Sequence, residues 1–89
     1  MSQTPNNKQY DLEQRTFNFA KNVREWLRGL KRTSATMEDC NQLMRSSGSV
    51  GANYIEANEA LSKKDFIMRA KICRKEAKES QLWLRLLHT

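Results

Sequence analysis

Residues 45–61 have the sequence RSSGSVGANYIEANEAL, which is typical of a flexible loop in its composition but of a helix in its periodicity. Apolar and small residues at alternating steps of four and three keep one stripe of a helix facing a neighbouring helix. Such a series starts at position 40 and comprises Cys40, Met44, Ser47, Gly51, Tyr54, Asn58 and Leu61. Glycine inside a helix costs about 1 kcal/mol relative to alanine. Gly48 and Gly51 therefore indicate close approach of a neighbouring backbone, and we expect a continuous helix here.

The remaining sequence predicts two further helices and a polar tail. Residues 1–9 are polar and aperiodic, which predicts a disordered tail. Asp11 and Gln14 form a capping-box pattern, and Ser62 precedes Asp65 at the same spacing. Proline and glycine are scarce, with 1 and 3 residues respectively, which favours an all-α chain. We expect one domain over residues 10–89, an antiparallel up-and-down helical bundle with helices at about 11–30, 36–60 and 63–87.

Each flanking helix has its own apolar stripe. In the first helix Phe17 and Ala20 are expected to widen a buried face formed by Leu12, Phe19, Val23, Trp26, Leu27 and Leu30. The third helix repeats the series of fours and threes at Phe66, Ala70, Cys73, Ala77, Ser80, Leu84 and Leu87. The second and third helices are therefore expected to pair as an antiparallel hairpin through matched seams of small residues.

Together with residues 62–67, SKKDFI, and residues 72–79, ICRKEAKE, the stretch 45–61 closely resembles the bacterial four-helix-bundle family first described from intervening sequences in 23S ribosomal RNA genes. The resemblance covers about residues 10–87. It implies a fourth helix that closes the bundle, whereas this chain ends at Thr89, where the connecting loop is expected. We expect either a shortened member or fragment, or a second subunit that supplies the missing face.

The resemblance also implies what the chain interacts with. The family consists of small basic helical proteins without known catalytic residues. One branch contains the accessory proteins of diversity-generating retroelements, which form five-fold rings whose basic surface contacts nucleic acid and a reverse transcriptase. By this precedent we expect a homo-oligomer, with a pentamer as one possible copy number. The expected oligomer interface is the apolar surface of the last turns, Leu82, Trp83, Leu86 and Leu87.

The net charge of +6 is unevenly distributed along the chain. Residues 1–35 carry +4, residues 36–61 carry −3, and residues 62–89 carry +5. Basic residues recur at helical spacing in the first and third helices. The solvated face of an amphipathic helix would also show this pattern, but most of the charge lacks a neutralising partner within its own helix. The candidate nucleic-acid-binding residues are Lys21, Arg24, Arg28, Lys31, Arg32, Lys64, Lys71, Arg74, Lys75, Lys78 and Arg85.

Other chemistries have little support in the sequence. Cys40 and Cys73 lack the neighbouring ligands of a zinc site, and we expect reduced core thiols rather than a disulfide. His88 lies beside the terminus without a catalytic partner nearby in sequence. Glu56 and Glu59 lack the histidine of a bundle di-metal site, so we expect them to pair with cations such as Arg45, Arg69 or Arg74. We therefore expect no cofactor, no metal and no enzymatic activity.

Two functions of different classes follow from these observations. The first is a homo-oligomeric accessory protein that binds RNA or DNA phosphates without sequence specificity. The alternative is a protein-interaction module that docks a reverse transcriptase or a ribosomal component without contacting nucleic acid itself. A genomic passenger of a ribosomal RNA gene with no strong cellular role is a third possibility. No apolar segment approaches the roughly 20 residues that span a bilayer, so we expect a cytoplasmic protein without membrane contact.

Overall fold

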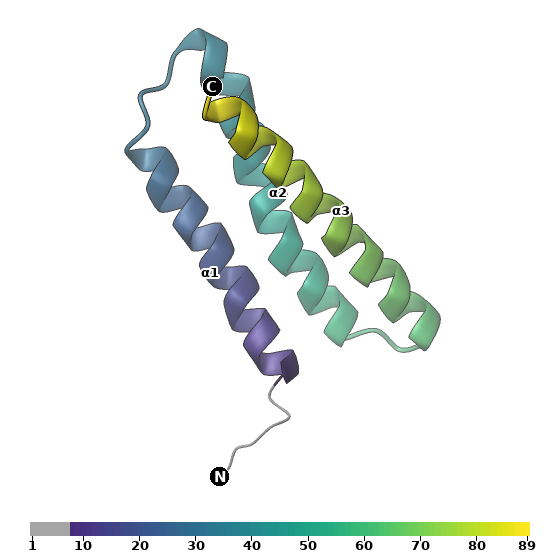
Figure 1. The fold of residues 1–89 in the computed structure, drawn as a ribbon. Coiled ribbons are helices and arrows are strands. Elements are labelled where there is room, and N and C mark those ends of the chain that lie inside the picture. The colour runs from purple at the N-terminus through teal and green to yellow at the C-terminus, as the bar shows by residue number, and fades with distance from the viewer. Residues whose placement is uncertain (1–7) are drawn as a thin grey trace.

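A computed structural model describes residues 8–89, with side chains from residue 11 onward, and these residues form three antiparallel helices (Figure 1). The helices are α1, Lys8–Arg28; α2, Ser34–Asn58; and α3, Lys63–Leu87. The all-α prediction is confirmed, and residues 46–53 are helical throughout. Residues 1–7 of the predicted tail lie outside the described residues.

The helix ends follow from local hydrogen bonding. α1 begins at Lys8, so the predicted capping box at Asp11 is wrong; the Asp11 carboxylate instead lies 3.8 Å from Arg15 within the helix. α2 is capped by Thr33, whose hydroxyl accepts from the Thr36 backbone N–H while the Thr36 hydroxyl accepts from the Thr33 N–H. The predicted cap of α3 is confirmed, since the Ser62 hydroxyl accepts from the Asp65 N–H at 3.1 Å.

Both outer helices pack against α2, and their backbones do not approach one another within the described residues. They meet through side chains at one end, where the Trp26 ring stacks on His88 with centroids 5.0 Å apart. Figure 1 shows α1 and α3 diverging from this end toward the loop that joins α2 to α3. The arrangement is therefore an open one, with α2 shared between two separate helix pairs.

The core is small and lies where the three helices are closest. Its buried apolar residues are Val23, Leu27, Cys40 and Leu43, with Phe19, Trp26, Leu30, Met44, Trp83, Leu84 and Leu87 packed around them. Between α2 and α3 the contact involves small side chains, some of which are polar. The hydroxyl oxygens of Ser46 and Ser80 lie 2.7 Å apart, and both residues are fully buried. Because each hydroxyl has a partner, burial leaves neither of them unsatisfied.

The prediction that α2 and α3 pair through the stripe of α2 that contains Ser47 and Gly51 is wrong. The stripe containing Ser47 and Gly51 faces α1, where Gly51 lies beside Thr16. α3 instead contacts a stripe displaced by one residue, since Cys73 donates to the Val50 carbonyl at 3.4 Å. Several residues expected in the core are exposed, namely Leu12, Phe17, Leu61, Phe66, Ala70 and Ala77.

Candidate nucleic-acid interface

The outward face of α3 carries the longest row of exposed cations. Lys64, Lys71, Lys75 and Lys78 are separated by seven, four and three residues, which places them on one side of the helix. Arg74 and Arg85 flank this row and are also exposed. At 1.5 Å per residue the row from Lys64 to Arg85 extends about 30 Å, the length of roughly nine base-pair steps of B-form DNA.

Two of the three acidic residues of α3, Glu76 and Glu79, form no ion pair with this row. Arg45 of α2 reaches across to α3 and places its two terminal nitrogens 3.3 Å from Glu76 Oε1 and 3.1 Å from Glu79 Oε1. Glu76 is buried, so this inter-helix contact provides a partner for a carboxylate that burial has desolvated. Within residues 8–89 the lysines of the row form no ion pair, and their charge faces solvent.

The same contact corrects the expected partners of Glu56 and Glu59. Arg45 forms its ion pairs with carboxylates of α3, and Arg69 donates to the Asn53 side-chain oxygen at 3.1 Å. In the described part of the chain neither Glu56 nor Glu59 has a cationic partner. The expected pairing of Arg45 with Glu56 or Glu59 is therefore wrong, since Arg45 pairs with Glu76 and Glu79.

The cations of α1 divide into two kinds. Lys21 and Arg28 are exposed, as are Lys31 and Arg32 in the segment that follows the helix. Arg24 is half-buried and donates to the Met44 carbonyl at 3.2 Å and to the Ser47 hydroxyl at 3.3 Å. Its guanidinium therefore joins α1 to α2, and we exclude it from the candidate interface.

The two basic rows lie on different helices, α1 and α3, which pack on α2 without backbone contact to each other in the described chain. The α3 row is the longer and the more continuous of the two. We therefore treat it as the principal candidate for phosphate contact.

Apolar side chains interrupt the basic face of α3. Near its start a hollow of about 570 Å³ is lined by Ile67 and Met68 together with Lys63, Lys64, Asp65 and Lys71. Near its end Leu82 and Leu86 are 47% and 43% exposed. Trp83 and Leu87, which were expected to share this surface, instead pack against the core. The predicted C-terminal patch is therefore reduced to the two exposed leucines.

Groups suited to metal binding or nucleophilic chemistry are sparse in the described chain. Across residues 8–89 no three His, Cys, Asp or Glu side chains gather closely enough to hold a metal ion. Cys40 and Cys73 are free thiols, and burial raises the pKa of the Cys73 thiol. Among the helices of this region, none has the length and apolar character needed to cross a bilayer.

A comparison with known families places these features in context. The family described as 23S rRNA-intervening sequence protein matches residues 8–89, which includes all three helices. No curated protein and no solved structure matches the chain.

Proposed function

The chain belongs to the 23S rRNA-intervening sequence protein family, and from this premise we propose that it is a nucleic-acid-binding accessory protein that acts as a homo-oligomer. In this proposal the α3 row binds RNA or DNA phosphates in the cytoplasm, and the protein performs no catalysis. The observation that carries the proposal is that Glu76 and Glu79 form ion pairs with Arg45 of α2. The α3 cations are therefore left without these carboxylates as partners.

The chemistry of the proposed contact is electrostatic. Lysine and arginine side chains that neutralise phosphates release condensed counterions, which favours binding at low salt. Phosphates carry no sequence information, so such contacts position a nucleic acid without reading it. We therefore expect similar affinities for unrelated sequences and a steep loss of affinity as salt rises.

The test compares two variants with equal losses of charge. One replaces Lys71, Arg74, Lys75 and Lys78 with glutamine, and the other makes the same change at Lys21, Arg28, Lys31 and Arg32. All eight residues are exposed, so both variants should retain the helical content of the native protein by circular dichroism. Binding to a fluorescent 20-nucleotide RNA and to a DNA duplex is then measured by anisotropy at low salt.

We expect the α3 variant to lose detectable binding and the α1 variant to keep most of it. Equal losses in both variants would mean that net charge alone governs affinity, and the α3 site would be wrong. Native affinity in the α3 variant would contradict the proposal outright.

The exposed apolar residues on the same face favour a second candidate function. Ile67, Met68, Leu82 and Leu86 have no role in a purely electrostatic contact with phosphates, whereas protein interfaces bury such apolar side chains inside a polar rim. The alternative is that α3 docks an acidic surface of a protein partner, such as a reverse transcriptase or a ribosomal component. Binding of nucleic acid by the isolated protein supports the first function, and binding that requires the partner supports the second.

A further inference from the structure

Two locally unfavourable features meet at the start of α3. Lys63 and Lys64 occupy its first turn, beside the positive pole of the helix, where cations are disfavoured. One turn later Ile67 and Met68 are 42% and 49% exposed. Within residues 8–89 neither lysine forms an ion pair. Natural sequences break such local rules at functional sites, which makes this end of α3 a candidate site.

These side chains line a single hollow of about 570 Å³, the α3 hollow. Ile67 has a lysine four residues before it and another four residues after it. Met68 follows Lys64 by four residues and precedes Lys71 by three. Because residues three or four apart are neighbours on a helix surface, lysines flank both apolar side chains along the helix.

The charge of the α3 hollow is positive on balance, with three lysines against Asp65. The Asp65 backbone N–H donates to the Ser62 hydroxyl, and the Asp65 carboxylate lies in the first turn, where the helix pole favours an acid. Asp65 therefore has a structural reason for its position, whereas the lysines have no ion-pair partner in the described chain. A ligand that fits this hollow supplies both anionic and apolar groups.

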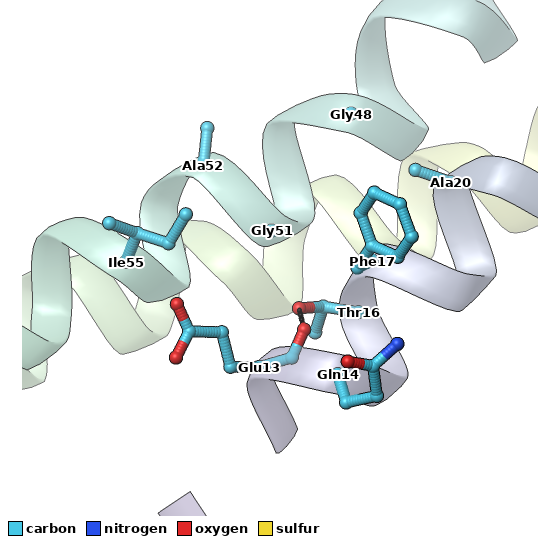
Figure 2. Close-up of a pocket in the computed structure, with 9 residues that line it drawn as sticks. All are labelled: Glu13, Gln14, Thr16, Phe17, Ala20, Gly48, Gly51, Ala52 and Ile55. Carbon is cyan, nitrogen blue, oxygen red and sulfur yellow. Dashed lines mark hydrogen bonds between the residues drawn. The ribbon is translucent and has the colours of Figure 1, made fainter. Parts of the chain in front are cut away.

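The groove between α1 and α2 provides a contrast (Figure 2). Its volume is similar, about 550 Å³, and its lining includes the exposed apolar residues Phe17 and Ile55. Among the described residues that line it, Glu13 alone is charged. Exposed apolar side chains are thus common to both hollows, and the lysines distinguish the α3 hollow.

We propose that the α3 hollow binds an acidic amphipathic helix of a protein partner. Apolar side chains of the partner cover Ile67 and Met68, and its carboxylates pair with the surrounding lysines. An amphipathic helix presents apolar anchors and flanking charges at the same spacing of three and four residues. The inference rests on the second candidate function, to which it assigns a place and a partner chemistry, and it is compatible with phosphate binding at the middle of α3.

The chemistry of the hollow favours this occupant over a nucleic acid or a lipid surface. Phosphates would neutralise the lysines, but bases stack on aromatic rings or guanidinium groups, and the lining residues include neither. A lipid surface favours apolar side chains gathered on one continuous face, whereas Ile67 and Met68 lie between lysines. Methionine also adapts its shape to different apolar partners, which suits a protein-binding surface.

The first experiment measures binding of a defined probe to the full chain. The probe is a fluorescent synthetic amphipathic peptide with leucines one turn apart and glutamates on either side, and its control has glutamine in place of each glutamate. Affinities are measured by anisotropy at low salt. We expect the acidic peptide to bind about tenfold or more tightly than the control peptide. Equal affinities would overturn the proposal, because the lysines would then have no part in recognition.

The second experiment alters the hollow without changing its charge. Ile67→Gln with Met68→Gln removes both apolar side chains, and Leu82→Gln with Leu86→Gln is the matched change at similarly exposed residues near the end of α3. Circular dichroism checks that each variant keeps the native helical content. We expect the first variant to weaken peptide binding about tenfold or more and the second to leave it unchanged. Equal losses in the two variants would show that the peptide has no specific site at the hollow.

A third variant tests whether exposed apolar residues alone recruit the peptide. Phe17→Gln with Ile55→Gln alters the groove between α1 and α2, whose lining lacks lysines among the described residues. We expect native peptide binding. A loss confined to this variant would place the peptide in that groove, and the proposal would be wrong.

Binding of fluorescent RNA by the same samples separates this inference from the phosphate proposal. The glutamine changes leave every cation in place, so RNA binding should be native in each variant. A chain that binds RNA but not the peptide would overturn the inference alone, and a chain that binds the peptide but not RNA would contradict the phosphate proposal alone. Binding to phosphatidylcholine–phosphatidylglycerol vesicles that is lost with Ile67→Gln and Met68→Gln would identify a lipid surface instead and overturn the inference.

Discussion

Arg24 differs from the other cations of α1 in what its guanidinium contacts. It donates to the Ala20 carbonyl within α1 and to Met44 and Ser47 across the helix interface. A methyl group at position 48 would lie 3.1 Å from one of its terminal nitrogens. Gly48 therefore provides space for this guanidinium, which is a different reason for glycine from the backbone approach expected from sequence.

Replacing Arg24 with methionine should destabilise the protein. The change removes hydrogen bonds that join α1 to α2 and leaves the Met44 carbonyl and the buried Ser47 hydroxyl with fewer partners. We expect the free energy of unfolding to fall by about 1–3 kcal/mol, measured by urea denaturation. Arg28→Met is the matched control, because Arg28 is exposed, and should change the same quantity by less than about 0.5 kcal/mol.

Cys73 should make stability depend on pH in the alkaline range. Burial raises the pKa of the thiol above its ordinary value of 9.0, so the unfolded chain releases this proton at lower pH than the folded chain. The contribution to stability is complete below pH 9 and is lost as the pH rises through the folded-state pKa. Between pH 8 and about 10.5, the native protein should lose more stability than Cys73→Ala in parallel urea titrations. Identical pH dependence in the two proteins would contradict the assignment.

At the scale of the elements, sequence was sufficient to identify the helices but not their partners. The start of α3 follows directly from Ser62 and Asp65, and the helical assignment of residues 46–53 follows from periodicity. The seam was misassigned because α2 has two neighbours and therefore two stripes one residue apart. Ser46 and Ser47 are both fully buried, and two adjacent small residues give no basis for choosing which faces α3.

The candidate site was predictable to a similar degree. Helical spacing predicted that the α3 lysines share a face, and their exposure agrees with this prediction. The spacing of residues gave no indication that Arg24 donates to the Met44 carbonyl or that Arg45 pairs with Glu76 and Glu79. These are contacts between residues distant in sequence. Such contacts depend on the relative rotation of the helices, which one sequence pattern does not specify.

The cap of α3 provides a test at this scale. Ser62→Ala removes the acceptor of the Asp65 N–H and leaves a backbone donor of the first turn without its side-chain partner. We expect a loss of about 1 kcal/mol in the free energy of unfolding. Ser34→Ala is the matched control, because Ser34 is an exposed residue in the first turn of α2 whose cap is Thr33. A loss of the same size in both variants would show that the cap contributes nothing specific.

At the scale of the whole molecule, the arrangement of charge follows from the arrangement of helices. The acidic α2 packs against two basic helices. Its one arginine, Arg45, forms ion pairs with Glu76 and Glu79 of α3. The cations of α1 and α3 lie on two helices whose backbones do not approach one another in the described chain. A nucleic acid bound along α3 would therefore meet six cations on one helix face, a number equal to the net charge of +6 that the whole chain carries.

This separation makes a prediction about salt that distinguishes local from overall charge. Each phosphate neutralised on duplex DNA contributes about −0.9 to the slope of log affinity against log salt. Replacing Lys71 and Lys75 alone with glutamine should reduce the magnitude of the slope by about 1.8, whereas Lys21→Gln with Arg28→Gln removes the same charge from α1 and should leave it nearly unchanged. Affinities are measured by anisotropy between about 50 and 200 mM salt. Equal changes of slope in the two variants would indicate that phosphates bind both faces alike, and the α3 row would then have no special part in binding.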